Sequence, residues 1–84
     1  MTRMRTFRGF DRITSDPTML GGKPCVRGLR ISVQRVLEVL AQNPTWQAMR
    51  ADYPELEEPD IRQALSFAAA LLTDIVIPLD SSAA

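Results

Sequence analysis

Two prolines limit how long any helix in the second half of the chain can be. Pro44 and Pro54 each lack the backbone N–H that a helix interior needs, and each steers the preceding residue away from the helical conformation. Helical segments must therefore end near Asn43 and Tyr53 and begin again after the prolines. The sequence predicts several short helices joined by brief turns.

Capping residues and apolar periodicity place three such helices. Ser32 is a good N-cap, and the apolar residues that follow it recur with the 3.6-residue period of one helix face. Thr45 can cap a second helix over residues 46–52. A third helix is expected from residue 57 or 58, where acidic side chains complement the helix dipole, to residue 73 or 74. Its expected apolar face consists of Ile61, Ala64, Leu65, Ala68, Leu71 and Leu72.

Residues 13–30 have a different character, because glycines and prolines interrupt them repeatedly. Such residues favour tight turns and short strands over helix. Cys25–Val26 and Leu29–Ile31 are the extended segments expected there. Before this region, Phe7 and Phe10 lie among arginines, and we expect them to pack on the body of the protein.

Together these segments predict the fold class and the organisation of the chain. Short helices joined by turns match a helix-turn-helix core, so we expect a mainly α, homeodomain-like fold with a short turn or β-strand region before it. The expected parts are a basic N-terminal arm over residues 1–12, a helix-turn-helix-like domain over residues 13–74 and an apolar C-terminal tail over residues 75–84.

The residue types that the chain lacks exclude several kinds of site. It has no histidine and a single cysteine, Cys25, so histidine-dependent catalysis, ordinary histidine zinc sites and internal disulfides are excluded. No segment approaches the ~20 apolar residues of a transmembrane helix, and the N-terminus lacks the apolar region of a secretory signal. We therefore expect a cytoplasmic binding protein without catalytic residues, cofactor or bound metal.

The charges of the chain are divided between its two halves. Residues 1–36 carry eight basic and two acidic residues, a net charge of +6, whereas residues 37–84 carry two basic and eight acidic residues, a net charge of −6. The basic half can attract phosphates and the acidic half repels them. A head-to-tail pairing of two copies would use the same charges, so the division alone leaves both interpretations open.

The order of several motifs resembles a known family. Arg12 to Pro17 is followed by Gly-Lys-Pro-Cys-Val-Arg-Gly at residues 22–28, and the Asp-Tyr-Pro turn at residues 52–54 precedes residues 60–65. This order and spacing are similar to the small prokaryotic domain-of-unknown-function family 433. Members of that family resemble antitoxins with a homeodomain-like helix-turn-helix, and many are encoded beside a toxin that resembles a PIN-domain nuclease.

The resemblance implies that the chain is the antitoxin of a type II toxin-antitoxin system. It would neutralise a PIN-like nuclease toxin, bind operator DNA to regulate its own transcription, and form a homodimer. The alternative is a homodimeric protein-interaction module that does not bind DNA. For the DNA-binding function, the expected contact residues are Arg3, Arg5, Arg8, Arg12, Lys23, Arg27, Arg30 and Arg35.

The acidic half suits the toxin instead. Acidic side chains at the start of the third helix repel DNA phosphates, so a conventional recognition helix is not expected there. They can cover the basic substrate surface of a nuclease, while the β-branched tail adds a strand or fills a groove. The expected partner-binding residues are Asp52, Glu55, Glu57, Glu58, Ile75, Val76, Ile77 and Leu79.

Overall fold

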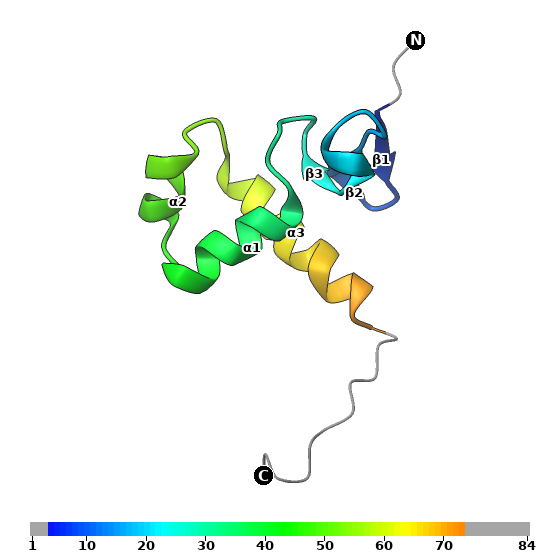
Figure 1. The fold of residues 1–84 in the computed structure, drawn as a ribbon. Coiled ribbons are helices and arrows are strands. Elements are labelled where there is room, and N and C mark those ends of the chain that lie inside the picture. The colour runs from blue at the N-terminus through cyan, green and yellow to red at the C-terminus, as the bar shows by residue number, and fades with distance from the viewer. Residues whose placement is uncertain (1–3, 74–84) are drawn as a thin grey trace, which may run out of the picture.

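Strands and helices occupy two separate parts of the chain (Figure 1). The structure, a computed structural model, describes residues 4–73. It begins with an antiparallel sheet in the order β1-β2-β3. The strands are β1 (Arg5–Phe7), β2 (Phe10–Ser15) and β3 (Cys25–Val26), with the 3-10 turn η1 (Leu20–Gly22) before β3. The helices that follow are α1 (Val33–Gln42), α2 (Trp46–Asp52) and α3 (Glu58–Leu71).

The prediction of a mainly α, homeodomain-like helix-turn-helix fold is wrong. A three-stranded sheet precedes the helices, and its central strand, β2, packs against α3. The described residues therefore form an α+β fold, in which the strands and helices are segregated along the chain. The sheet supplies one side of the core that a helix-turn-helix protein would have to build from helices alone.

The hairpin β1–β2 forms where a basic arm was predicted. Gly9 makes its turn at a φ of 83°, which residues with a side chain rarely adopt. The rings of Phe7 and Phe10 then lie 4.8 and 5.3 Å from the ring of Phe67, in edge-to-face geometry. The packing of both phenylalanines on the body is confirmed. The prediction of a separate basic arm is therefore wrong for residues 5–12. These residues belong to the hairpin, which its aromatic contacts with α3 hold on the body of the protein.

The helices lie where the sequence signals predict them. The Ser32 hydroxyl accepts a hydrogen bond from the backbone N–H of Arg35 at 2.9 Å, and the Thr45 hydroxyl accepts one from Ala48 at 3.1 Å. These two caps begin α1 and α2 at the predicted residues, and α1 ends just before the Asn43-Pro44 pair. The helix positions are confirmed, since local signals specify them.

The extended segments are confirmed only in part. Cys25–Val26 is β3, and Val26 pairs with Ile13 of β2. Leu29–Ile31 is not a strand, although the Ile31 carbonyl accepts a hydrogen bond from the N–H of Val26 at 2.9 Å. That segment is the return from a tight turn, and it leads directly into α1.

The hydrophobic core lies between the sheet and the three helices, and Ala64 and Phe67 are its residues on α3. Its buried residues are Ile13, Val26, Ile31, Val33, Val36, Val39, Met49, Leu56, Ala64 and Phe67. The predicted apolar face of α3 is only partly correct: Ala64 is buried, but Leu65, Leu71 and Leu72 are 47%, 59% and 56% exposed. Phe67, which was not assigned to that face, fills the core instead.

Candidate functional site

One carboxylate is fully buried at the start of α3 and binds two arginines from the other part of the chain. Asp60 has no exposed surface. Arg27 Nε lies 2.9 Å from its Oδ1 and Arg27 Nη2 lies 2.9 Å from its Oδ2, while Arg12 Nη1 lies 2.9 Å from Oδ1. The backbone N–H of Glu57 also donates to Oδ2 at 2.8 Å, as in a helix capping box. We call these four residues the Asp60 cluster.

Further hydrogen bonds connect the arginines of the Asp60 cluster to their surroundings. Arg12 Nη1 lies 2.8 Å from Glu57 Oε1, and the backbone N–H of Arg12 donates to Gln63 Oε1 at 2.9 Å. Arg27 Nη2 donates to the Glu55 carbonyl at 2.8 Å. The cluster therefore fastens β2 and the β3–α1 connection to the first turn of α3.

Protonation in the Asp60 cluster follows from these contacts. Burial alone would raise the pKa of Asp60, because the carboxylate loses hydration. Hydrogen bonds from Arg27, from the Glu57 N–H and from Arg12 outweigh burial and hold the Asp60 pKa below its ordinary value of 3.8. Hydrogen bonds with Glu57 and Asp60 raise the pKa of Arg12, and that with Asp60 raises the pKa of Arg27. Asp60, Arg12 and Arg27 are therefore charged at neutral pH.

Arg27 also has an unusual backbone conformation. Arg27 and Gly28 have φ values of 46° and 71°, and the N–H of Leu29 donates to the Val26 carbonyl at 2.7 Å. Positive φ at both central positions is typical of a type I′ turn, and a residue with a side chain is strained there. The contacts with Asp60 stabilise Arg27 in this strained conformation. Arg27 therefore has a structural role.

Three of the predicted DNA-binding residues thus have partners within the protein. Arg12 and Arg27 bind Asp60. Arg35 Nε donates to the Tyr53 hydroxyl at 3.0 Å, and Arg35 Nη1 lies 3.6 Å from a carboxylate oxygen of Glu38. The side chain of Arg35 is 54% exposed, against 28% for Arg12 and 33% for Arg27, so Arg35 is the most accessible of these three.

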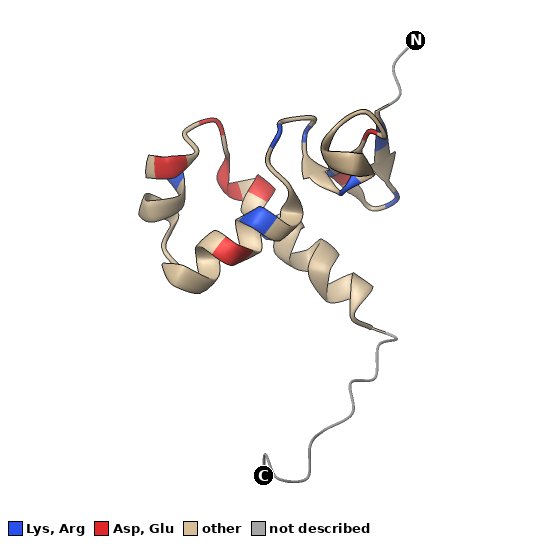
Figure 2. Cartoon of the chain, in the orientation of Figure 1, with Lys and Arg blue, Asp and Glu red and all other residues tan. Residues whose placement is uncertain are grey.

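Four other predicted DNA-binding residues are exposed and free of ion pairs within residues 4–73. They come from β1, the hairpin turn, the segment before β3 and the β3–α1 connection. We call them the open basic set, which consists of Arg5, Arg8, Lys23 and Arg30. Arg3, also predicted, lies outside the described residues. In Figure 2, most basic positions lie over the sheet and the β3–α1 connection.

The predicted partner-binding acids lie mainly around the connection between α2 and α3 (Figure 2). Asp52, Glu55, Glu57 and Glu58 are all exposed. Glu57 is nevertheless paired with Arg12, and Glu58 lies 3.4 Å from Arg62 on the next turn of α3. Among the predicted acids, Asp52 and Glu55 are therefore the ones without an ion pair to another described residue. The remaining predicted partner-binding residues, Ile75, Val76, Ile77 and Leu79, lie outside the described residues.

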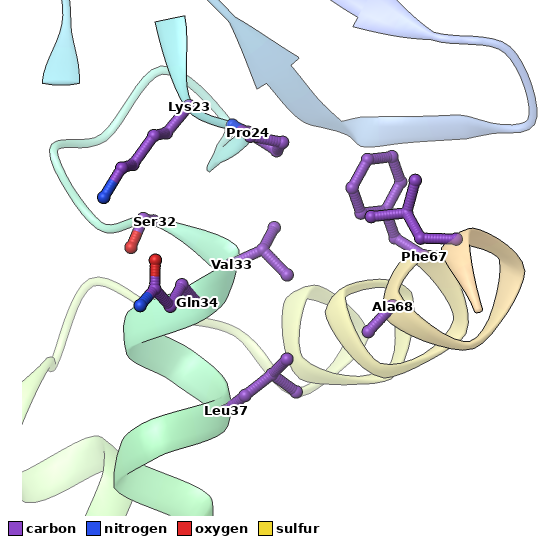
Figure 3. A pocket seen from close by; sticks show the side chains of 9 residues that line it. Lys23, Pro24, Ser32, Val33, Gln34, Leu37, Phe67 and Ala68 are labelled. Carbon is purple, nitrogen blue, oxygen red and sulfur yellow. The ribbon is translucent and has the colours of Figure 1, made fainter. Parts of the chain in front are cut away.

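Two concave surfaces flank these charged regions. One, of about 340 Å³, is bordered by Arg30 of the open basic set and by Asp52 and Glu55. The other, of about 250 Å³, is an apolar groove between the start of α1 and the second half of α3 (Figure 3). The apolar side chains that line this groove are Pro24, Val33, Leu37, Phe67, Ala68 and Leu71.

Other features of the described residues bear on the chemistry expected from the sequence. Cys25 is 2% exposed, its Sγ lies 3.2 Å from the Lys23 carbonyl, and burial raises the pKa of its thiol. The thiolate form is therefore disfavoured. Residues 4–73 contain no group of three or more His, Cys, Asp or Glu side chains placed to hold a metal ion. In the same range, no helix has the length and apolar character to cross a bilayer.

Sequence reasoning missed the central role of Asp60. Acidic residues at a helix start are usually solvated, and the sequence gives no sign that one of them is buried. The spacing of Glu57 and Asp60 does match the N-cap and N3 positions of a capping box, so it could have predicted the local hydrogen bond between them. The two arginine partners could not be identified, because they lie 33 and 48 residues away.

Comparison with known proteins gives one family and one distant relative. Residues 13–68 match the family described as "Protein of unknown function (DUF433)". Over 58 residues the chain is 38% identical to "Uncharacterized protein y4eO" of Sinorhizobium fredii (strain NBRC 101917 / NGR234). The alignment covers 69% of this chain and 26% of that protein, so the chain spans about a quarter of its relative. No solved structure matches the chain.

Proposed function

The chain belongs to the DUF433 family, and from this membership and its surface charges we propose that it is the antitoxin of a type II toxin-antitoxin system. It binds and neutralises a PIN-like nuclease toxin, and it binds operator DNA to regulate its own transcription. It acts in the cytoplasm, as a homodimer, and catalyses no reaction. The observation that carries the proposal is that Arg5, Arg8 and Lys23 of the open basic set are exposed in the sheet part of the chain, whereas the exposed acids Asp52 and Glu55 belong to α2 and the α2–α3 connection.

The DNA-binding part of the proposal rests on the open basic set. Its side chains are exposed and have no carboxylate partner within residues 4–73, so their charges remain available to phosphates. Arginine offers several N–H donors in a fixed planar arrangement that matches phosphate oxygens. Arg12 and Arg27 are left out of the proposed DNA-contact surface. If they bound DNA instead of Asp60, the buried Asp60 carboxylate would lose its positively charged partners.

The toxin-binding part rests on the opposite charge. Asp52 and Glu55 lie on the α2–α3 side of the molecule, away from most of the basic residues (Figure 2). A nuclease needs a basic surface to hold its nucleic acid, and an acidic surface of a protein partner can occupy it. The residues Ile75, Val76, Ile77 and Leu79 would add apolar contacts to the same partner.

DNA binding is tested with the salt dependence of affinity for the sequence upstream of the gene. The Arg5→Ala/Arg8→Ala double variant removes two exposed cations, so the slope of log K against log [salt] should fall in magnitude by roughly 2. Arg50→Ala is the matched control, because Arg50 is an exposed arginine on α2, outside the open basic set. An unchanged slope for the double variant would remove the open basic set from the proposal.

Toxin neutralisation is tested by co-expression with the neighbouring gene and by rescue of growth. Reversing the acidic surface with Asp52→Lys and Glu55→Lys should abolish rescue, because like charges would then face the nuclease. Glu38→Lys on α1 is the matched charge reversal and should still rescue. Rescue by every variant would contradict the proposed acidic interface.

The alternative function is a homodimeric protein-interaction module that does not bind DNA. The concave surface shared by Arg30, Asp52 and Glu55 brings opposite charges to one rim, which is compatible with self-association. This alternative predicts that salt weakens dimerisation and that the upstream DNA is bound no better than unrelated DNA. The same salt titration, carried out with the upstream DNA and with unrelated DNA, therefore separates the two functions.

A further inference from the structure

The apolar groove between the start of α1 and the second half of α3 has room for several side chains (Figure 3). Its volume is about 250 Å³, and a protein cavity of roughly 150 Å³ already holds a benzene-sized group. Leu71 forms part of its wall and is 59% exposed. Apolar side chains placed in this groove would remove apolar surface from water on both sides of the contact.

The groove lies next to the point where the chain continues into an apolar segment. Leu71 is the last residue of α3, and three residues separate it from Ile75. Residues 75–79 have the sequence Ile-Val-Ile-Pro-Leu, and we call them the tail segment. The short connection gives the tail segment a high effective concentration at the groove. A segment of another molecule does not have this advantage.

We infer that, in the free protein, the tail segment lies in the groove of its own chain. The part of α3 that lines the groove runs from Phe67 to Leu71 and is about 6 Å long. Five residues in extended conformation span about 16 Å. The tail segment is therefore long enough to turn back after α3 and to cross the groove.

The residue types of the tail segment suit this position. β-branched residues favour an extended backbone, in which alternate side chains point to opposite sides. Ile75, Ile77 and Leu79 then face one side, and Val76 faces the other. Pro78 has no N–H to donate to a neighbouring strand, so it suits a groove of side chains better than the interior of a sheet. The three larger side chains fill the groove.

Charge favours one direction for the tail segment across the groove. In Figure 3, Lys23 and Phe67 lie on opposite sides of the groove. A tail segment that starts on the α3 side reaches the Lys23 side at its far end, where Asp80 follows in the sequence. Lys23 is exposed, so it can attract Asp80 there. Exposed ion pairs are weak, so this one orients the tail segment and leaves Lys23 in the open basic set.

Docking in the groove bears on the toxin contacts proposed above. The same apolar side chains cannot fill the groove and contact a nuclease at once. A toxin that binds them has to withdraw the tail segment from the groove, and this consequence rests on the proposed function. The docking itself does not, because a chain that binds neither toxin nor DNA still fills its own groove.

Nuclear Overhauser effects in the free, full chain test the inference directly. Docking brings the Ile77 methyl groups close to the Phe67 ring and the Leu37 methyl groups, so we expect cross-peaks between them. Isotope filtering on a mixture of labelled and unlabelled chains separates contacts within one chain from contacts between two chains. Absence of these cross-peaks would overturn the inference. Cross-peaks found only between chains would also overturn it, because the groove would then hold the tail segment of a second copy.

Substitutions on the two sides of the tail segment provide a second test. Ile77→Asp places a charge in the apolar groove, so the cross-peaks from Ile75 and Leu79 to the groove should be lost. Tm should fall by roughly 4–8 °C, because the chain loses a buried aliphatic contact. Val76→Asp is the matched control, since it adds the same charge one position away, on the opposite side. It should keep the cross-peaks and the Tm of the wild-type chain. Equal effects of the two variants would contradict the placement of Ile77 in the groove.

Discussion

Arg8 and Arg12 are four residues apart on one hairpin, yet their surroundings differ completely. Arg12 binds the carboxylates of Asp60 and Glu57, whereas Arg8 is exposed and has no ion pair within residues 4–73. The Asp60 cluster and the open basic set therefore divide the basic residues of the first half into a structural group and an available group. Residue type and net charge do not distinguish the two groups. Only the position of a buried carboxylate from the other half does.

This difference changes the interpretation of the charge asymmetry. The +6 of the first half includes Arg12 and Arg27, whose charges are balanced by Asp60 and Glu57 across the fold. The surface that can attract phosphate is thus smaller than the sequence suggests. This surface consists of the open basic set, because Arg12 and Arg27 are paired with carboxylates within the fold.

The largest effect that would sharpen this comparison is expected at the buried carboxylate. Asp60→Asn removes the charge that two arginines share, and loss of one partner of a buried ion pair costs roughly 3 kcal/mol. The free energy of unfolding from urea titration should fall by about that amount, with a decrease in Tm of roughly 4–8 °C for each kcal/mol. Asp52→Asn, at an exposed aspartate, should change stability by less than about 0.5 kcal/mol. Equal effects of the two variants would contradict a special role of Asp60.

The contribution of Asp60 to the free energy of unfolding should disappear at low pH. Its folded-state pKa lies below the ordinary 3.8, so its contribution to stability is complete above that value and is lost as the pH falls through the folded-state pKa. The stability difference between the wild-type chain and Asp60→Asn should therefore be constant near neutral pH and shrink below about pH 3.8. Urea titrations at several pH values measure it. A difference that persists undiminished at the lowest pH would argue against the ion pairs as its source.

A smaller effect is expected in the turn that carries Arg27. Gly28 has a φ of 71°, and a Cβ there would lie 2.8 Å from Met4 Sδ. The Met4 side chain can move, so the main cost of Gly28→Ala is the positive φ, about 1 kcal/mol. Gly21→Ala is a useful comparison, since its φ is 66° and no atom lies within 4 Å of the added Cβ. Similar losses for both would attribute the cost to the backbone, and a much larger loss at Gly28 would indicate the contact.

The sequence predicted the parts of the fold that local signals determine. Ser32, Thr45 and the residues before Pro44 and Pro54 place the helix ends, because capping and proline act within a few residues. The β1–β2 hairpin was missed, since it depends on contacts between its phenylalanines and Phe67, more than fifty residues further along the chain. Long-range packing of this kind leaves no periodic pattern in a three-residue strand such as β1.

The candidate site was predicted with the same strengths and weaknesses. Arg8 and Lys23 are exposed, as most arginines and lysines are, and their contact with DNA stays a prediction. Arg12 and Arg27 could not be separated from them, since the separation depends on Asp60. Whether an acidic residue is solvated or buried is decided by the elements that pack on it. No local spacing encodes that outcome for an arginine 48 residues away.

One comparison tests most directly whether the arginines divide into a structural and an available group. The free energy of unfolding and the affinity for the upstream DNA are measured for Arg8→Ala and for Arg12→Ala. We predict that Arg8→Ala weakens binding to the upstream DNA while its free energy of unfolding stays within about 0.5 kcal/mol of the wild-type value. Arg12→Ala should lower stability and, at a temperature where it is folded, bind DNA as the wild-type chain does. A fully stable Arg12→Ala variant that loses as much DNA affinity as Arg8→Ala would contradict the account.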